Sequence, residues 1–292
     1  MIVNQSALTS MYKSFKVLFN ETFKNAETYR EKVATEVPST TRENAYKWLG
    51  SFPRLREWIG ERQVKQLAAH DYAIKNKSFE ATIEVDRDDI EDDQYGIYRP
   101  MIEEMGRAAK AHPDILVFEV LNKGFENFCY DGQYFFDTDH PVKGQSVSNF
   151  QGGSGTPWFL LDTTRAIKPI IFQMRRKPQF VSLDKVDDEN VFMKKKFLYG
   201  VDYRGNAGYG LWQLAYASKQ DLTAENYASA RAAMMSFKDD EGVALGIKPN
   251  LLVVPPSLEG AAKEILENER DANGATNKWR NTADLLVVPY LA

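Results

Sequence analysis

Apolar residues near the N-terminus recur at helical spacing. Residues three or four positions apart lie on one face of a helix, so residues 8–33 are predicted to form one amphipathic helix. Its apolar face would consist of Leu8, Met11, Tyr12, Phe15, Leu18, Phe19, Phe23, Ala26, Tyr29 and Val33. The proline and hydroxyl residues at 37–41 predict a linker that leads into a new helix.

Strict alternation of apolar and polar residues replaces helical spacing further along the chain. Phe79, Ala81, Ile83 and Val85 would face one side of a strand, with polar residues between them. Residues 75–78 read as a turn back to an earlier strand, which predicts a projecting two-stranded hairpin. Two interpretations remain open: an ordinary surface hairpin, or a ribbon that packs on another molecule, since an isolated ribbon is marginally stable.

An acidic run separates this hairpin from the next helix. Residues 86–93 carry six carboxylates in eight positions but lack the ligand spacing of an EF-hand loop. The run is therefore interpreted as a solvated face or helix N-terminal cap. A helix is expected to follow, with Pro100 near its first turn and His112-Pro113 as its stop.

The middle of the chain is predicted to be rich in strands. β-branched and aromatic residues between turn residues predict strands at 115–121, 133–138, 157–163, 167–174, 178–183, 191–201 and 210–219. Two glycine clusters, at 152–155 and 204–210, lack the flanking residues of phosphate or dinucleotide loops and are predicted to be turns. Neither cluster therefore indicates a nucleotide site.

The C-terminal third alternates helix and strand. A helix capped near Thr223 is followed by LLVVP at Leu251, a helix over about 257–268, and a second LLVVP at Leu285. Two short, wholly apolar strands joined by a helix are typical of a covered α/β sheet.

Composition narrows the function classes. The chain has 292 residues, 43% of them hydrophobic and 27% charged, which is typical of a soluble globular protein with a substantial core. Its net charge of −4 argues against tight binding to phosphate backbones. The basic triplets at 175–177 and 194–196 are interpreted as solvated strand ends. No signal peptide or membrane span is evident, so synthesis in the cytoplasm is expected.

Candidate chemistry is concentrated in one short stretch. Asp137, Asp139 and His140 could bind a divalent cation or act as acid and base in a metal-assisted hydrolase. Alternatively they form a turn, because Pro141 ends the segment and aspartates favour turns by bonding their own backbone. The turn is favoured, since the sequence offers no second His-rich or Cys-rich segment. Cys129, the single cysteine, is expected to be a buried, inert thiol.

Several long stretches resemble the family of Mu-like phage and prophage major head subunits. They include WLGSFPRLREWIGER, YAIKNKSFEATIEVDRDDIEDDQYGIY, CYDGQYFFDTDHPV, LLDTTRAIKPIIFQ and YGVDYRGNAGYGLWQLAYASKQ. The resemblance runs in order along the whole chain. It implies an α+β capsid fold of the HK-ninety-seven type, built from an N-arm, an extended loop, a peripheral domain with a long spine helix, and an α/β axial domain.

The resemblance also implies boundaries for these parts. They are an N-arm at 1–40, a connecting segment at 41–68, an extended loop at 69–88, a peripheral domain with its spine helix at 89–150, and further peripheral strands with the axial domain at 151–292.

A structural role follows from the resemblance. It implies pentamers and hexamers that close into an icosahedral shell around double-stranded DNA, contacted without sequence specificity. Partners would be a scaffold or protease, a portal and decoration proteins. Assembly in the bacterial cytoplasm and a final place in the virion are expected, with no membrane. No catalytic, cofactor-binding or metal-binding residue is implied, and lysine-to-asparagine crosslinking is not assumed.

Overall fold

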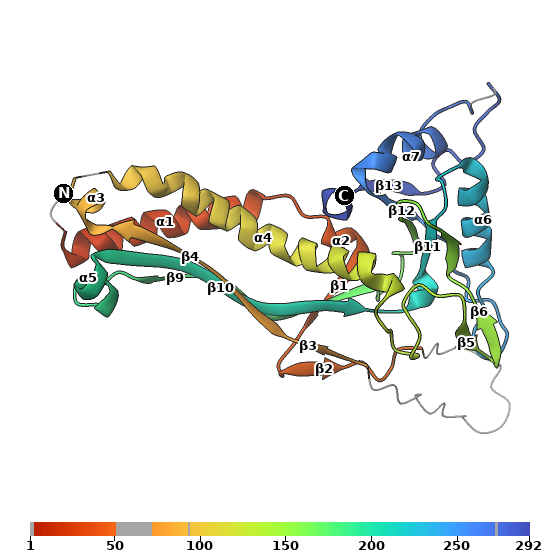
Figure 1. The fold of residues 1–292 in the computed structure, drawn as a ribbon, viewed down its shortest axis with the longest axis horizontal. Helices are drawn as coiled ribbons and strands as arrows, with labels where there is room; N and C mark the ends of the chain where they lie inside the picture. The colour runs from red at the N-terminus through yellow and green to blue at the C-terminus, as the bar shows by residue number, and fades with distance from the viewer. Residues whose placement is uncertain (1–2, 51–71, 93, 272–273) are drawn as a thin grey trace.

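The computed structural model describes residues 3–50, 72–92, 94–271 and 274–292. It has two halves (Figure 1). The elongated half contains the N-terminal helix, the first part of the longest helix and most of a long sheet. The broad half contains a five-stranded sheet with two further helices. Among the described helices, none is both long enough and apolar enough to cross a membrane.

The N-terminal segment forms two helices rather than one. Asn4 caps α1 (Gln5–Asn25) by accepting a hydrogen bond from the Ala7 N–H, and the extended backbone of Ala26 ends the helix. A short second helix, α2 (Arg30–Val33), follows. Residues 34–38 then form β1 (Ala34–Pro38), and residues 39–42 link it to another strand, β2 (Glu43–Ala45). Part of the predicted linker is therefore present, but the predicted new helix start is wrong. The apolar spacing was correct for the buried face of α1, which contains Leu8, Met11, Phe15 and Phe19.

A four-stranded sheet runs along the elongated half in the order β1-β9-β10-β4. Strand β4 (Lys77–Asp86) pairs with β10 (Lys196–Tyr209) over its whole length, and β10 also pairs with β9 (Ile170–Leu183). The register between β9 and β10 shifts on both sides of Arg204, which marks a bulge.

The predicted hairpin is therefore wrong in its pairing. Strand β3 (Ala73–Lys75) pairs with β2 (Glu43–Ala45), not with β4. The alternation did identify a strand and its buried side, because Val85 is fully buried. Residues 51–71 lie outside the described residues. They include His70 and most of the connecting segment.

The spine-like helix is longer than predicted. Asp86 caps α3 (Arg87–Glu91), which confirms a capping role in the acidic run. After η1 (Tyr95–Tyr98), α4 (Arg99–Asn122) continues through Pro113 and ends at η2 (Lys123–Phe125). The predicted stop at His112-Pro113 and the strand at 115–121 are wrong, because Val117, Phe118 and Leu121 extend the buried stripe of α4.

The broad half contains a five-stranded sheet in the order β13-β12-β8-β11-β7. Its strands are β7 (Phe150–Gly153), β8 (Trp158–Leu161), β11 (Ala215–Lys219), β12 (Leu251–Val254) and β13 (Asp284–Val287). The two LLVVP segments pair in parallel as β12 and β13, which confirms the predicted α/β arrangement. Helix α6 (Ala224–Met235) has the predicted Thr223 cap, and α7 (Glu259–Leu266) joins the two strands.

Three further segments differ from the prediction. Residues 133–138 form bends with one isolated β-bridge, from Tyr134 to Phe128, rather than a strand. Strands β5 (His140–Val142) and β6 (Gln145–Val147) form a hairpin just after them. Helix α5 (Glu189–Lys194) replaces the start of the strand predicted at 191–201. The glycine-rich segment 204–209 belongs to β10 rather than to a turn. Short helices η3 (Trp212–Leu214), η4 (Pro256–Leu258) and η5 (Pro289–Leu291) complete the fold.

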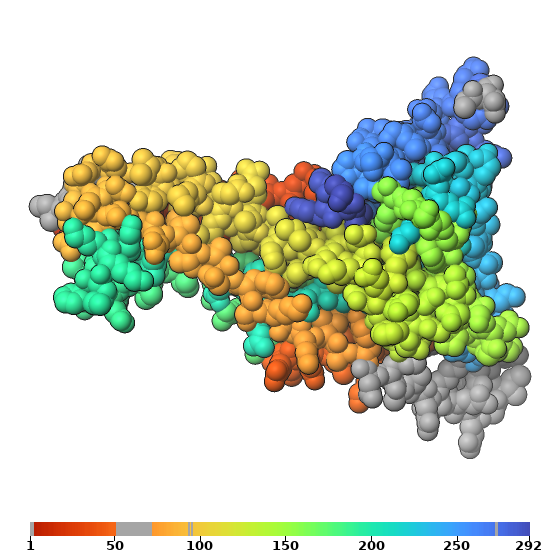
Figure 2. All heavy atoms as spheres, in the orientation of Figure 1, coloured from red at the N-terminus to blue at the C-terminus, as the bar shows by residue number. Residues whose placement is uncertain are grey.

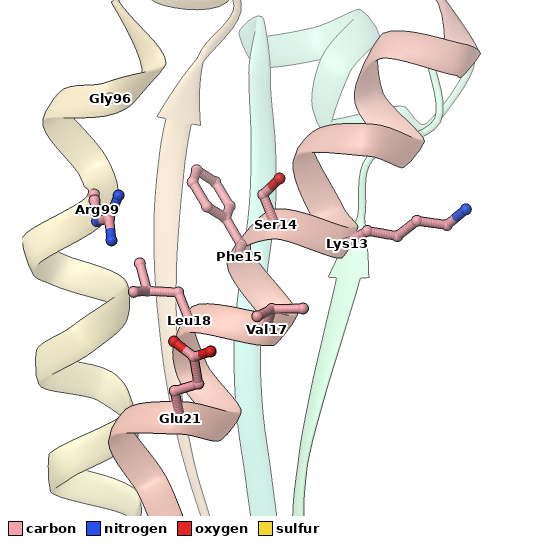
Figure 3. A pocket seen from close by; sticks show the side chains of 8 residues that line it. All are labelled: Lys13, Ser14, Phe15, Val17, Leu18, Glu21, Gly96 and Arg99. Atoms are coloured by element: carbon pink, nitrogen blue, oxygen red, sulfur yellow. The ribbon is translucent and has the colours of Figure 1, made fainter. Parts of the chain in front are cut away.

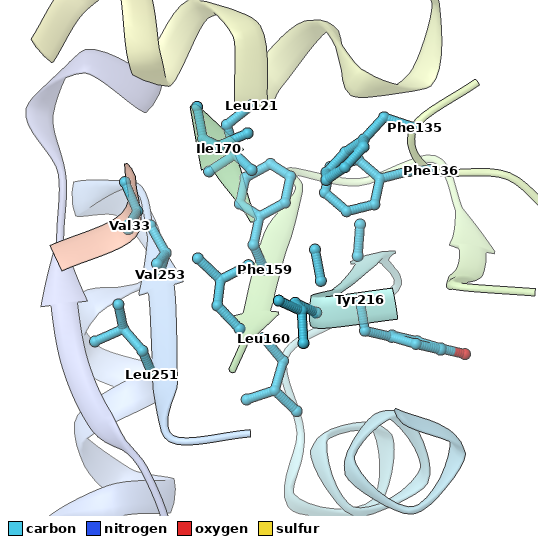
Figure 4. Close-up of a cluster of buried hydrophobic side chains, with 14 of the residues drawn as sticks. Val33, Leu121, Phe135, Phe136, Phe159, Leu160, Ile170, Tyr216, Leu251 and Val253 are labelled. Atoms are coloured by element: carbon cyan, nitrogen blue, oxygen red, sulfur yellow. The ribbon is translucent and has the colours of Figure 1, made fainter. Parts of the chain in front are cut away.

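Each half has its own hydrophobic core. The larger cluster lies where the sheet of the broad half meets the end of α4, and includes Leu121, Phe136, Phe159 and Ile170 (Figure 4). The second cluster lies between α1, α4 and the sheet of the elongated half, and includes Phe15, Phe19, Met105 and Tyr199. Val201 belongs to the second cluster and Tyr203 to the first, so the bulge lies between the two cores.

Candidate functional site

His140 is the fully buried centre of a polar network in the segment 126–149, which we call the turn region. Its Nδ1 lies 2.8 Å from Asp131 Oδ2, and its Nε2 lies 3.2 Å from Asn149 Oδ1. The ring stacks on Trp212, with 4.0 Å between centroids and an interplanar angle of 11°. These contacts fix both the position and the plane of the imidazole.

The orientation of Asn149 determines which ring nitrogen carries hydrogen. Asn149 Nδ2 donates to the carbonyl of Phe135 at 2.8 Å, and Asn149 Oδ1 accepts the backbone N–H of Asp137 at 2.9 Å. Asn149 therefore presents an acceptor oxygen to His140, so Nε2 must be a donor. Nδ1 faces the Asp131 carboxylate.

Cys129 and Asp131 complete the network. Cys129 Sγ donates to Asp131 Oδ1 at 3.0 Å, and the Gln133 N–H donates to the same oxygen at 3.1 Å. Burial raises the pKa of the Cys129 thiol, and the charge of Asp131 raises it further. Burial alone would raise the pKa of Asp131, but hydrogen bonds from His140 and Cys129 outweigh it and hold this pKa below its usual range. Cys129 is therefore a buried thiol rather than a reactive thiolate.

The predicted trio of Asp137, Asp139 and His140 does not form one site. Asp137 Oδ1 accepts the Thr138 N–H at 2.7 Å, and its Oδ2 accepts the Tyr134 N–H at 3.3 Å, so this side chain stabilises a turn. The side chain of Asp139 is exposed, and His140 instead bonds to Asp131 and Asn149. The hydrolase hypothesis for these three residues is therefore wrong, and the turn interpretation holds for Asp137.

Asp131 and Asn149 were not identified as candidates from the sequence. Each lies nine positions from His140, one before it and one after it. The available indication was the presence of Asp131 two residues after Cys129 in a segment already rich in polar ligands.

A groove in the elongated half lies between α1 and the start of α4 (Figure 3). Its volume is about 540 Å³, and its lining combines apolar with charged side chains. The lining residues are Lys13, Ser14, Phe15, Val17, Leu18, Glu21, Gly96 and Arg99. No histidine or cysteine lies among them, so the groove offers no nucleophile paired with a histidine base.

The tip of the elongated half exposes apolar side chains. The segment around α5 projects from this end of the molecule (Figure 2). Phe192 is 85% exposed and Met193 is 69% exposed, and Val181, Leu183 and Val186 nearby are also exposed. Large apolar side chains gathered on a projecting tip indicate a contact surface. The basic triplet at 175–177 is solvent-exposed, as predicted, but it lies inside β9 rather than at a strand end.

Comparisons with known proteins agree with the sequence resemblance. The profile of the family described as Mu-like prophage major head subunit gpT matches residues 8–291. The major capsid protein of Escherichia phage Mu is 44% identical over 305 residues, an alignment that covers 100% of both chains.

Two solved structures of bacteriophage JBD30 are also similar. A chain of its procapsid superposes with a TM-score of 0.88 at 46% identity, covering 99% of this chain and 100% of that one. A chain of its capsid decorated with minor capsid protein trimers gives a TM-score of 0.77 at 37% identity, covering 92% of each chain.

Proposed function

The chain belongs to the Mu-like prophage major head subunit gpT family and is a major capsid protein, and we propose that its copies form pentamers and hexamers that close into an icosahedral shell around double-stranded DNA. Its α+β fold is a phage capsid fold, and it acts as a structural component of the virion rather than as an enzyme. The observation that carries the proposal is the full-length similarity to a procapsid subunit at a TM-score of 0.88.

The parts of the subunit take the following roles in our proposal, which extends the HK-ninety-seven-type division. Residues 1–40 form the N-arm, 41–68 a connecting segment, 89–150 the peripheral domain with α4 as its spine, and 151–292 further peripheral strands with the axial domain. Support comes from the separate core beneath α1 and α4 and from the covered sheet of the broad half.

Only part of the range assigned to the extended loop, 69–88, is free to project from the subunit in our proposal. Residues 77–86 form β4 and are held by β10 along their whole length. Within 69–88, we therefore place any part that reaches over a neighbouring subunit before Lys77. Deletion of β4 would remove the fully buried Val85 and is expected to unfold the elongated half.

The apolar tip around α5 is proposed to contact a second copy of this chain in the shell. A Phe side chain that is 85% exposed is unfavourable in an isolated subunit and becomes favourable when a neighbour covers it. Repeated copies of one chain are the partner that a shell supplies at every such tip.

Contacts with other molecules follow from charge and from relatives. We propose that packaged DNA is contacted weakly and without sequence specificity, because the net charge is −4 and the clusters of basic residues singled out in the sequence are only two separate triplets. A scaffold or protease and a portal are proposed as assembly partners. Decoration by a minor capsid protein is proposed because a relative's capsid carries such trimers.

Electron microscopy of particles made by the expressed chain, together with the other head proteins of the phage or prophage that encodes it, tests this function. Closed shells with five-fold and six-fold capsomers would support it. A folded subunit that stays monomeric at every concentration and never enters particles would overturn it. A filter-binding assay on purified capsomers tests the DNA proposal, which submicromolar, sequence-selective binding would contradict.

A further inference from the structure

We propose that Cys129, Asp131 and His140 form a binding site for one Zn²⁺ ion, which stabilises the turn region. The proposal is independent of the shell function and concerns a structural ion rather than a catalytic one. It rests on ligand geometry, on the orientation of His140, on charge balance, and on access from solvent.

The three ligand atoms already converge. Cys129 Sγ, an Asp131 carboxylate oxygen and a His140 ring nitrogen all lie within 4.8 Å of one another. Bond lengths to zinc of about 2.0–2.3 Å place ligand atoms roughly 3–4 Å apart in a tetrahedral site. The carboxylate lies 3.0 Å from Sγ and 2.8 Å from Nδ1, so an ion requires only a small adjustment of these side chains.

A second residue orients His140 as a metal ligand. Ligating histidines generally donate their other ring N–H to a fixed acceptor, which selects the tautomer. Asn149 Oδ1 is such an acceptor at 3.2 Å from Nε2, and it is itself held by the Asp137 N–H. With hydrogen on Nε2, the lone pair of Nδ1 points toward Asp131 and Cys129. Stacking on Trp212 fixes the plane of the ring.

Charge balance favours a divalent ion at this depth. With Cys129 bound as a thiolate, Asp131 as a carboxylate and His140 as a neutral imidazole, the ligands carry two negative charges that neutralise Zn²⁺. The protons that these side chains hold in the absence of the ion leave to water when it binds. The ion and its ligands then form a neutral unit, which leaves no uncompensated charge among side chains that are almost fully buried.

The ligand set selects the metal, and a neighbouring cavity supplies access. Thiolate and imidazole favour zinc over magnesium or calcium, which prefer oxygen ligands. A cavity of about 270 Å³ is lined by Asp131 and Trp212 together with Tyr130, Lys238 and other residues. Asp131 is the only one of the three ligands that lines this cavity, so the ion would enter, and a water molecule would reach it as the fourth ligand, from the Asp131 side.

Cobalt(II) substitution tests the site directly. Titration of the purified full-length chain with Co²⁺ is expected to give a thiolate-to-cobalt charge-transfer absorption in the near ultraviolet that saturates at one ion per chain. Zn²⁺ is expected to displace it. Cys129→Ser should abolish the band, whereas Asp139→Asn, which alters an exposed carboxylate in the same region, should leave it unchanged.

A measurement on the unaltered chain keeps the test decisive if Cys129→Ser fails to fold. Elemental analysis after gel filtration should give one zinc per chain, and EDTA should lower the melting temperature. Folded protein that retains no zinc, shows no cobalt band and melts at the same temperature with or without EDTA would overturn the proposal. The network would then be held by hydrogen bonds alone.

Discussion

Arg30 and Asp114, which are 84 positions apart, form an ion pair in which both side chains are at least nine-tenths buried. Arg30 Nη1 lies 3.3 Å from Asp114 Oδ1, and the Tyr29 N–H donates to Asp114 Oδ2 at 2.6 Å. The guanidinium also lies 5.4 Å from the centre of the Phe172 ring. This one carboxylate therefore attaches α2 and the chain before it to the middle of α4.

Removing the carboxylate should be costly. Asp114→Ala leaves the buried Arg30 charge with only the half-exposed Glu36, 3.4 Å away, as a partner. Loss of one member of a buried pair costs up to about 3–5 kcal/mol, and the remaining Glu36 contact should reduce that cost. Urea unfolding of the unassembled subunit measures the change. Glu103→Ala is the matched control, because its pair with Arg99 is exposed and worth about 0.3–0.5 kcal/mol. Equal effects of the two substitutions would contradict this interpretation.

Gly106 allows α1 and α4 to pack closely. A Cβ at this position would lie 2.8 Å from the backbone oxygen of Phe19. Although alanine favours helix formation by about 1 kcal/mol over glycine, Gly106→Ala should destabilise the subunit, because overpacking costs typically 1–3 kcal/mol. Gly260→Ala in α7 meets nothing within 4 Å and should stabilise by up to about 1 kcal/mol. Thermal melting of both variants tests the contrast, which a stabilised Gly106→Ala would refute.

Asp137 and Asp139 should respond differently to the same substitution. Asp137→Leu removes the acceptor for two backbone N–H groups and should cost about 1 kcal/mol. Asp139→Leu changes an exposed side chain and should stay within about 0.5 kcal/mol of the unaltered chain. Chemical denaturation of both variants is the measurement. A larger loss for Asp139→Leu would show that the turn depends on the other aspartate.

Asp86 gives a pH-dependent contribution at the tip. The hydrogen bond from Lys196, with the Asp88 N–H in second place, lowers the pKa of this carboxyl. A carboxyl group whose pKa is lower in the folded protein than in the unfolded chain contributes to stability. This contribution is fully present above the unfolded pKa, near 3.9, and is lost as the pH falls through the folded pKa. Asp86→Asn keeps a capping side chain and should cost less than about 1 kcal/mol at pH 7, because the pair is partly exposed. Urea unfolding at pH 7 and pH 2 should show the difference disappear in acid; a difference that persists at pH 2 would exclude the carboxylate as its cause.

Phe192 should affect assembly rather than folding. Phe192→Ser changes a side chain that is 85% exposed, so the melting temperature of the free subunit should hardly change. Particle yield should fall, since the tip loses apolar area that a neighbouring copy would cover. Phe192→Leu keeps that apolar character and should assemble. Normal shells from Phe192→Ser, counted by electron microscopy, would exclude this tip as an important contact.

Local sequence patterns predicted elements better than their partners. The Thr223 cap and the two LLVVP strands depend on neighbouring residues and were predicted correctly. The alternation in β4 identified its buried side, but its partner β10 lies more than a hundred positions away, and local alternation carries no information about that pairing. The apolar, β-branched run at 115–121 suits either a strand or a buried helix, and packing of α4 against both cores decides the outcome.

The candidate site shows the same limit. Asp137, Asp139 and His140 are adjacent in sequence, yet the chain direction reverses around them and brings Asp131 and Asn149 to the imidazole instead. A turn was predictable from aspartates beside Pro141. The network was not, because it depends on the orientation of Asn149, which backbone carbonyls and an N–H from separate segments hold in place.

The bulge around Arg204 is braced on both sides by elements that pass it without a break. It shifts the register of β9 on β10 near the boundary of the two cores, but β4 stays paired with β10 from Lys77 to Asp86, and α4 runs unbroken from the second cluster to the first. We therefore expect the subunit to behave as one stiff lever, so that a push on the tip around α5 is transmitted along α4 and β4 to the core of the broad half.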